Sequence, residues 1–162
     1  MDEALAKEVA LVEPGVRVEA TGPPKEDCPF CDIVGSRMGW KRRSSGVVIG
    51  RSAATFPDNY PVAPDHMLVV PRRHVTSVLQ LDRDETSDLW SMVNLVVDQL
   101  KVKGITDMNI GTNVGALAGQ TIEHAHVHVI PRREGDVKDP RGGVRWVIPE
   151  KARYWTMHNY PA

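Results

Sequence analysis

The sequence has little net charge, few cysteines and no long hydrophobic run, and each of these absences excludes a class of protein. The chain has 162 residues and a formal net charge of −1, so nothing indicates a nucleic-acid-binding surface or a polybasic membrane anchor. No apolar run approaches the roughly 20 residues that a membrane-spanning helix needs, and residues 1–4 lack the basic-then-apolar layout of a signal peptide. We therefore expect a single-domain cytoplasmic protein that binds neither nucleic acid nor membrane.

The only two cysteines form a Cys28-x-x-Cys31 pair. Without a secretion signal, this spacing is typical of half of a metal site or of a redox dithiol, and it does not indicate a disulfide framework. A redox dithiol of this kind lies in a thioredoxin-like βαβ unit, and the surrounding sequence lacks that pattern. The pair therefore favours metal binding, provided that two further ligands converge on it from elsewhere in the chain.

The pattern of apolar and turn-forming residues predicts an α+β fold. The clearest helix begins at a capping box formed by Asp82 and Glu85, carries an apolar stripe from Leu89 to Leu100, and ends at Gly104. The other expected elements are a short helix at 32–38, short strands at 47–49 and 53–56, a strand buried on both faces at 66–71, and a strand at 108–114. This order of elements favours a mostly antiparallel sheet.

The most informative stretch is Gly119-Gln120-Thr121-Ile122-Glu123-His124-Ala125-His126-Val127-His128-Val129-Ile130-Pro131. Three histidines alternate with apolar residues, which is the period of a β-strand, and the proline ends the pattern. A strand would place all three imidazoles on one face, with neighbouring Cα atoms about 7 Å apart. Such a row rarely arises by chance, so we expect the chemistry of the protein here and not a solvated row on the surface.

Two kinds of chemistry fit a row of histidines. His-x-His on a strand can supply two ligands of a catalytic zinc, or one imidazole can attack phosphorus while its neighbours orient it and bind the phosphate oxygens. The spacing alone does not separate these alternatives. The segment Gly119-Gln120-Thr121 precedes the row and supplies backbone N–H groups and a hydroxyl, which are the donors that a phosphate needs and a bare metal site does not.

The row and an upstream segment together resemble the histidine triad (HIT) family. The matching motifs are Gly119-Gln120-Thr121-x-x-His124-x-His126-x-His128-Val129-Ile130-Pro131-Arg132 and Asp58-x-x-Pro61-Val62-Ala63-Pro64-x-His66-x-Leu68-Val69-Val70-Pro71-x-x-His74. The resemblance covers roughly residues 28–136. It implies a HIT-like fold with a five-stranded, mostly antiparallel sheet, one long helix and one short helix. We expect an N-terminal arm (1–25), a HIT domain (26–136) and a C-terminal tail (137–162).

The resemblance also implies what the histidines do. By resemblance to this family, the chain is expected to be a nucleotidyl hydrolase or transferase that acts at the α-phosphate of nucleotides. By this analogy His126 is the nucleophile that carries a covalent nucleotidyl-histidine intermediate, His128 hydrogen-bonds the phosphate, and His66 completes the catalytic cluster with His124. The implied substrate-binding positions are Asp58 for the ribose and, for the phosphates or the leaving group, Asn113, Gly119, Gln120 and Thr121.

A structural zinc is implied by the same resemblance. Some family members, and the related hexose-phosphate uridylyltransferases, carry zinc on a Cys-x-x-Cys pair completed by two histidines. The matching residues here are Cys28, Cys31, His74 and His124. Such a closed shell of ligands leaves no open position for catalysis, so we expect the zinc to stabilise the fold, and we expect neither an organic cofactor nor Mg²⁺.

The segment Pro131-Arg132-Arg133-x-Gly135-Asp136 resembles the fragile-histidine-triad and diadenosine polyphosphate hydrolase branch. We therefore expect cleavage of a dinucleoside polyphosphate. Nucleoside phosphoramidase and dinucleoside polyphosphate phosphorylase activities are the alternatives, while a metal-hydroxide hydrolase or a nucleotide-sensing module is less favoured. The family usually forms homodimers by joining two sheets into one continuous sheet, and we expect the same here. The C-terminal region often shapes leaving-group specificity in the family, so Trp146 and Trp155 are candidates for that role or for packing.

Overall fold

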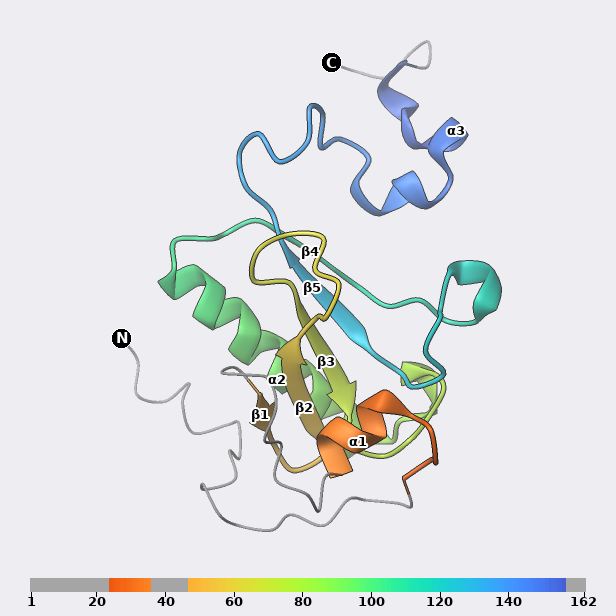
Figure 1. The fold of residues 1–162 in the computed structure, drawn as a ribbon. Helices are drawn as coiled ribbons and strands as arrows, with labels where there is room; N and C mark the ends of the chain where they lie inside the picture. The colour runs from red at the N-terminus through yellow and green to blue at the C-terminus, as the bar shows by residue number, and fades with distance from the viewer. Residues whose placement is uncertain (1–23, 36–46, 157–162) are drawn as a thin grey trace.

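The computed structural model describes residues 24–35 and 47–156. Its centre is a five-stranded sheet with the strand order β1-β2-β3-β5-β4, in which each neighbouring pair is antiparallel (Figure 1). The strands are β1 (Val48–Ile49), β2 (Ala53–Pro57), β3 (Met67–Pro71), β4 (Met108–Gly111) and β5 (Val127–Pro131). The expected α+β fold with a five-stranded antiparallel sheet is confirmed.

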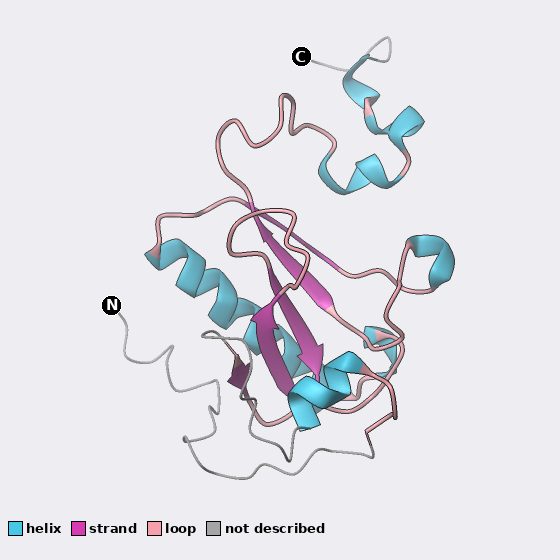
Figure 2. Cartoon of the chain, viewed as in Figure 1, coloured by secondary structure: helices cyan, strands magenta, loops and turns pink. Residues whose placement is uncertain are grey.

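One helix lies on each face of this sheet. The short helix α1 (Pro29–Gly35) packs on one face and the long helix α2 (Arg83–Val102) packs on the other (Figure 2). The remaining helical segments are η2 (Val78–Gln80), η3 (Ala116–Ala118), η4 (Gly143–Val147), α3 (Pro149–Ala152) and η5 (Tyr154–Thr156). No helix in the part of the chain that the structure describes is long and apolar enough to cross a membrane.

Strand β3 is buried on both faces, as its continuous apolar run predicts. Leu68 and Val70 pack with the side chains of α1, whereas Val69 packs with the side chains of α2. Alternate side chains of a strand point to opposite faces of the sheet, so a strand with a helix on each side needs apolar residues at every position. This central strand separates the two halves of the core.

Helix α2 begins and ends where the sequence predicts. The Asp82 carboxylate accepts the Glu85 N–H at 2.8 Å, and the Glu85 carboxylate accepts the Asp82 N–H at 3.1 Å, which completes the capping box. Gly104 has a φ of 79° just beyond the last turn, a conformation that favours glycine. The buried apolar residues of the helix are Leu89, Met92, Val93, Val96 and Leu100. Each of them contributes roughly 1.5–3 kcal/mol by leaving water, so this stripe fixes the helix on the sheet.

The histidine row is only partly a strand, and the prediction of one continuous strand through all three histidines is wrong. Regular pairing begins at Val127, because the preceding Ala125 N–H donates to the Val75 carbonyl at 2.7 Å in a loop and not to a neighbouring strand. The alternation of faces still holds. Val127 packs against α2, whereas the rings of His124 and His126 contact Phe30 of α1.

Two other boundaries differ from the sequence prediction by three residues, and one end of each of β1, β2 and β3 differs by one residue. Helix α1 starts at residue 29, three residues before the expected start at 32, and residues 36–38 of the expected helix lie outside the described residues. Strand β4 stops at Gly111 and not at residue 114, because the chain turns there into the loop that holds η3. The N-terminal arm up to residue 23 also lies outside the described residues.

Candidate active site and metal centre

His126 lies where the chain enters β5, and it is only 5% exposed. Its Nδ1 lies 2.7 Å from the carbonyl oxygen of His124. A carbonyl oxygen only accepts, so the neutral His126 ring carries its proton on Nδ1 and keeps a lone pair on Nε2. The rings of Phe30 and His128 lie edge-on to it, with centroids at 5.4 Å and 5.0 Å. The fold therefore fixes both the orientation and the tautomer of this imidazole.

A chain of hydrogen bonds determines the tautomers of His66 and His128 as well. The Val62 N–H donates to His66 Nδ1 at 3.3 Å, and His66 Nε2 lies 3.0 Å from His128 Nδ1. An amide N–H only donates, so the neutral His66 ring carries its proton on Nε2 and donates to His128 Nδ1. His128 then keeps its proton on Nε2, which makes that atom a donor. We call this sequence of bonds the histidine relay.

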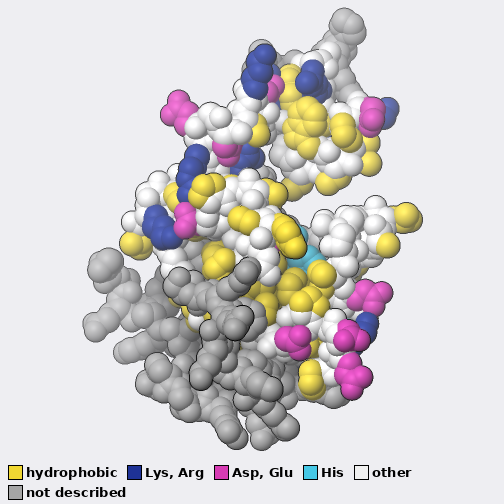
Figure 3. Space-filling model, viewed as in Figure 1, with side chains coloured by type: hydrophobic (Ala, Val, Ile, Leu, Met, Phe, Trp, Pro, Cys, Tyr) yellow, Lys and Arg dark blue, Asp and Glu magenta, His cyan; other side chains and the backbone are white. Residues whose placement is uncertain are grey.

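Burial keeps the relay neutral. Desolvation lowers the pKa of His66, although the Asp58 carboxylate, with Oδ2 3.6 Å from His66 Nδ1, acts in the opposite direction. Desolvation also lowers the pKa of His128, and the neighbouring His126 and His66 add to this effect. The side chain of His128 is 25% exposed. Figure 3 shows histidine surface at the base of a hollow between the C-terminal segment and the loop that carries η3.

The loop between β4 and β5 is held in shape by Gln120. Its Oε1 accepts the Gly115 N–H at 2.8 Å, and its Nε2 donates to the carbonyls of Thr76 and Ile122 at 2.8 Å and 3.1 Å. Gly115 and Gly119 both have a φ of 87°, a backbone conformation that residues other than glycine rarely adopt. The expected substrate residue Gln120 thus uses its amide to hold this loop, both internally and against Thr76 of the segment after β3.

The other expected substrate residues lie around the same region. The Asp58 carboxylate is beside the histidine pair, with Oδ2 3.9 Å from His128 Nδ1. Asn113 is half-buried, and its Nδ2 lies 3.9 Å from the position that a Cβ on Gly119 would take. Thr121 is exposed. The structure therefore brings Asp58 to the histidines and places the remaining candidates on the loop that precedes them.

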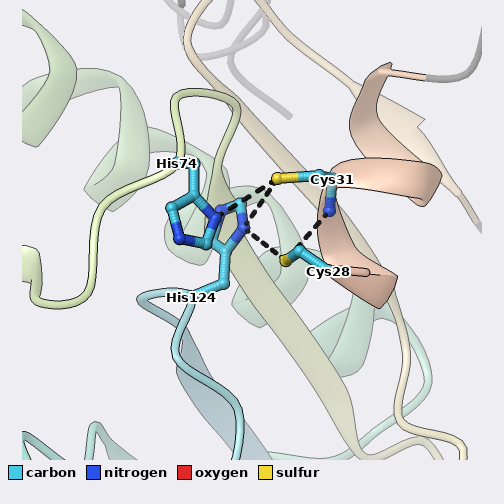
Figure 4. A group of neighbouring side chains, drawn as sticks. All are labelled: Cys28, Cys31, His74 and His124. Atoms are coloured by element: carbon cyan, nitrogen blue, oxygen red, sulfur yellow. Dashed lines mark hydrogen bonds between the residues drawn. The ribbon is translucent and has the colours of Figure 1, made fainter. Parts of the chain in front are cut away.

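Two cysteines and two histidines converge on a second site, shown in Figure 4. One Sγ or Nδ1 atom from each of Cys28, Cys31, His74 and His124 lies within 4.8 Å of the others. The sulfur–nitrogen distances are 3.4 Å from Cys28 to His124, 3.3 Å from Cys31 to His74 and 3.6 Å from Cys31 to His124. A tetrahedral zinc with ordinary bond lengths separates a sulfur and a nitrogen ligand by about 3.6 Å. The four side chains therefore fit a zinc ion.

The protonation of these ligands also suits a metal. His124 Nε2 donates to the Pro71 carbonyl at 2.9 Å, which leaves the lone pair on Nδ1, the atom that faces the cysteines. A histidine that binds a metal commonly makes such a bond with its other nitrogen. Burial lowers the pKa of His124 to about 4 and raises the pKa of the Cys31 thiol to about 11. The imidazole is therefore ready to bind a metal, and the thiol would release its proton on binding.

The histidine row is thus divided between two sites that share a peptide group. The side chain of His124 faces the cysteines, while its own carbonyl oxygen accepts from His126. The N–H of the same peptide group belongs to Ala125 and donates to Val75, which follows the ligand His74. The position of the His126 ring therefore depends on the peptide group that the metal centre holds.

A second group of ligand atoms bears on the alternative metal-hydroxide chemistry. One atom from each of Asp58, His66 and His128 lies within 4.8 Å of the others. A cation bound there would have to replace the bond from Val62 to His66 or the bond from His66 to His128. The observed contacts therefore favour the histidine relay over a catalytic metal.

A cavity of about 1110 Å³ lies between the sheet and the C-terminal segment. Ile130 and Arg132 line it from the side of β5, and both tryptophans that the sequence singles out, Trp146 and Trp155, line it from the segment. Alternation along a strand places Ile130 on the same face as His128. The cavity therefore borders, at Ile130, the sheet face on which His128 lies.

Sequence reasoning missed several contacts that shape these sites. It did not predict the contact of Phe30 with two histidine rings or the Val62 N–H bond, because neither has a motif of its own. It also missed the ion pairs of Asp65, which has a φ of 65° just before His66. The sequence does indicate the turn itself, since Pro64 followed by Asp65 is typical of a turn, but it does not indicate the ion pairs.

Comparison with known proteins agrees with this geometry. A HIT domain family model matches residues 44–135 of the 162. The chain is 39% identical over 88 residues to an asymmetrical bis(5'-nucleosyl)-tetraphosphatase from Schizosaccharomyces pombe, with 54% of this chain and 48% of that protein covered. It is 35% identical over 95 residues to an AP-4-A phosphorylase from Mycobacterium tuberculosis, with 56% and 49% covered. The chain thus spans about half the length of these curated relatives.

The fold has a solved counterpart as well. The crystal structure of a HIT family protein from Bacillus anthracis matches with a TM-score of 0.59 and 27% sequence identity, over 68% of this chain and 77% of that one. The family model covers more than half of the sequence, and the structure places two histidines of the motif, His126 and His128, beside each other. The chain belongs to the HIT domain family.

Proposed function

We propose that this chain is a nucleotide hydrolase or nucleotidyl transferase that cleaves a dinucleoside polyphosphate at the α-phosphate, with His126 as the nucleophile. The observation that carries this proposal is the bond from His126 Nδ1 to the His124 carbonyl at 2.7 Å, because it leaves a lone pair on Nε2 of an oriented ring. The tetraphosphatase name of the Schizosaccharomyces pombe relative supports the substrate class.

The chemistry follows from the tautomers. His126 Nε2 attacks the α-phosphorus, a P–N bond forms, and the P–O bond to the leaving phosphate breaks, so the leaving group departs with the electron pair. The ring becomes cationic, and its Nδ1–H bond to the His124 carbonyl strengthens as charge develops. Water then attacks the same phosphorus, the P–N bond breaks, the electron pair returns to Nε2, and one proton is released to solvent.

The surrounding groups have complementary roles in this proposal. The Nε2–H of His128, oriented by His66, donates to a phosphate oxygen and stabilises the charge that accumulates in the transition state. Asp58 binds the ribose. Asn113, Gly119, Gln120 and Thr121 form the surface that meets the phosphates or the leaving group. Phosphoryl-type transfer requires mainly a positioned nucleophile and donors aimed at negative charge, and these residues supply both.

We also propose that zinc occupies the site formed by Cys28, Cys31, His74 and His124. The sulfur–nitrogen distances and the lone pair on His124 Nδ1 support it. Such a closed site contributes folding energy and leaves the nucleotide chemistry to other residues.

A homodimer that extends the sheet is proposed as well, because β4 is an edge strand with one unpaired side within the described chain. The HIT domain then spans residues 26–136, between the arm and the tail.

A phosphorylase is the second candidate function, because one relative is an AP-4-A phosphorylase. The two reactions share the covalent step and differ only in whether water or inorganic phosphate attacks the intermediate. A nucleoside phosphoramidase would differ in the leaving group. A panel of dinucleoside polyphosphates and adenosine phosphoramidate, each with and without inorganic phosphate, separates these possibilities by the products formed.

The covalent mechanism is tested by rapid quench in base with nucleotide labelled at the α-phosphate. A phosphoramidate on histidine is stable in base and labile in acid, so label should stay with the wild-type protein and be absent from His126→Ala. Loss of the nucleophile should lower kcat by several orders of magnitude. If no label is retained in base while chelator added during the assay stops turnover at once, a metal-bound hydroxide replaces histidine as the nucleophile.

A further inference from the structure

The turn that leads into His66 holds an acidic residue in a conformation that favours glycine. The His66 N–H donates to the Ala63 carbonyl at 3.1 Å, which closes a turn with Pro64 and Asp65 at its centre. Asp65 has a φ of 65°. The third position of a type II turn requires such a positive φ, and glycine or asparagine adopts it most readily. The backbone alone therefore gives no reason for aspartate at this position.

The side chain of Asp65 supplies the reason, because it is paired on both oxygens. Oδ1 accepts from Lys103 Nζ at 2.7 Å, and Oδ2 accepts from Arg133 Nη2 at 2.8 Å. Arg133 also donates from Nη1 to the Pro64 carbonyl at 3.0 Å. The two cations lower the pKa of the Asp65 carboxyl, with Lys103 as the larger cause. We call Asp65, Lys103 and Arg133 the Asp65 clamp.

The Asp65 clamp joins three parts of the molecule, namely the turn before His66, the end of α2 and the segment after β5. Lys103 directly follows helix α2, and Arg133 lies two residues after the end of β5. β5 is also the strand that carries His128. The clamp thus connects the turn before His66 to the strand of its hydrogen-bonding partner and to the helix that packs on the sheet.

The loop held by the Asp65 clamp contacts both the backbone and the ring of His66. The Asp58 N–H donates to the His66 carbonyl at 3.0 Å, and the Val62 N–H donates to His66 Nδ1. Both donors lie in the same loop as Asp65. A shift of the turn would therefore move the Val62 N–H and the His66 ring together, away from His128.

We propose that Asp65 is a positioning residue, which through Lys103 and Arg133 holds His66 within hydrogen-bonding distance of His128. Asp65 touches neither histidine ring, so it acts only through the loop. The effect on turnover rests on the proposed function, whereas the effect on the histidine pair does not.

The test uses Asp65→Gly and Asp65→Asn in the full-length protein. Both replacements accept a positive φ, so each removes the charge without straining the turn. Asp98→Asn is the matched control, because Asp98 makes an exposed ion pair with Lys101 on the surface of α2. With a dinucleoside polyphosphate as the probe, kcat should fall roughly three- to tenfold in both Asp65 variants, as the loss of two partly exposed ion pairs allows. KM should stay within about twofold, because binding groups are retained.

A double-mutant cycle with Lys103→Met tests whether the clamp acts as a unit. If Lys103 acts through Asp65, then Asp65→Asn combined with Lys103→Met should lower kcat no further than Asp65→Asn alone. Additive effects of the two substitutions would mean that Lys103 acts elsewhere and would overturn the clamp.

The imidazole ¹⁵N resonances give a measurement that does not depend on turnover. The wild-type protein should show His66 protonated on Nε2 and His128 protonated on Nε2, and both Asp65 variants should show mixed tautomers. If the wild-type protein turns over none of the nucleotides, the proposed function fails while these spectra still decide the role of Asp65. Spectra of both variants that match Asp98→Asn would overturn the proposal, even with a lower kcat.

Discussion

Removing the metal from the Cys28, Cys31, His74 and His124 site should unfold helix α1 locally and leave the rest of the domain folded. Helix α1 has only seven residues, and isolated helices shorter than about 12–15 residues are marginal in water. Its anchors besides the cysteines are the buried side chains of Phe30, Ile33 and Val34. The proposed zinc would join this helix to two histidines that lie on other segments.

The magnitude follows from the burial of α1. Three buried apolar side chains contribute roughly 1.5–3 kcal/mol each, or about 5–9 kcal/mol together. Ordering the backbone of seven residues costs roughly 1–2 kcal/mol each, or about 7–14 kcal/mol. By this balance the helix lacks a few kcal/mol of stabilisation without metal, and bonds from the cysteines to the proposed zinc would supply it. Helix α2 buries five apolar side chains without any metal contact, so it should stay folded.

Hydrogen–deuterium exchange with mass spectrometry measures this difference directly. Chelated and zinc-loaded protein are compared at one pH, with peptides from residues 24–35 and from 89–100. Exchange in 24–35 should accelerate strongly after chelation, while 89–100 should exchange at the same rate in both samples. Equal protection of 24–35 in the two samples would refute the local role of the metal. Simultaneous loss of protection in 89–100 would show that the metal supports the whole domain instead of α1.

Three further predictions concern the relay, the long helix and the loop before the row. Because burial lowers the pKa of His66 and His128, both rings should stay neutral in the folded protein down to a pH below the ordinary value of about 6.5. The two neutral rings contribute to the stability of the fold above the unfolded-state pKa of about 6.5, and this contribution is lost as the pH falls through the lower folded-state pKa. Thermal unfolding at several pH values would measure this loss. Asp82→Ala removes the N-cap of α2 and should cost about 1 kcal/mol, or roughly 2–4 °C in Tm, whereas Asp98→Ala on the exposed surface of the same helix should change Tm little. Gln120→Ala removes three hydrogen bonds of the loop, so steady-state kinetics should show a severalfold higher KM with an unchanged Tm, and an unchanged KM would contradict a role for the loop in binding.

The features that the sequence predicts correctly are those encoded by the local pattern of side chains. The capping box of Asp82 and Glu85, the apolar stripe and Gly104 define α2 from both ends, and the structure confirms them. The continuous apolar run at 66–71 indicates a strand buried on both faces, because only a strand with a layer on each side needs every position to be apolar. These signals are local, so one sequence is enough to identify them.

The parts that the sequence did not predict depend on backbone groups and on distant partners. The Val62 N–H has no side-chain signature, yet it determines the tautomer of His66. The ion pairs of Asp65 join residues that are 38 and 68 positions apart in the chain, and no short motif encodes such pairs. Helix α1 starts at Pro29, three residues before the predicted start, and proline is common in the first turn of helices.

The departure of the histidine row from a regular strand has a chemical consequence. In an antiparallel ladder, the carbonyl oxygen of each hydrogen-bonded residue accepts from the neighbouring strand. Pairing begins only at Val127, so the His124 carbonyl accepts instead from Nδ1 of His126. A strand that continued back to His124 would direct this carbonyl toward a neighbouring backbone and leave the His126 ring free to rotate or to change tautomer. The side-chain pattern therefore predicts a strand at His124, whereas the backbone there is irregular. The proposed chemistry requires this irregular backbone, and such disagreement is common at functional sites.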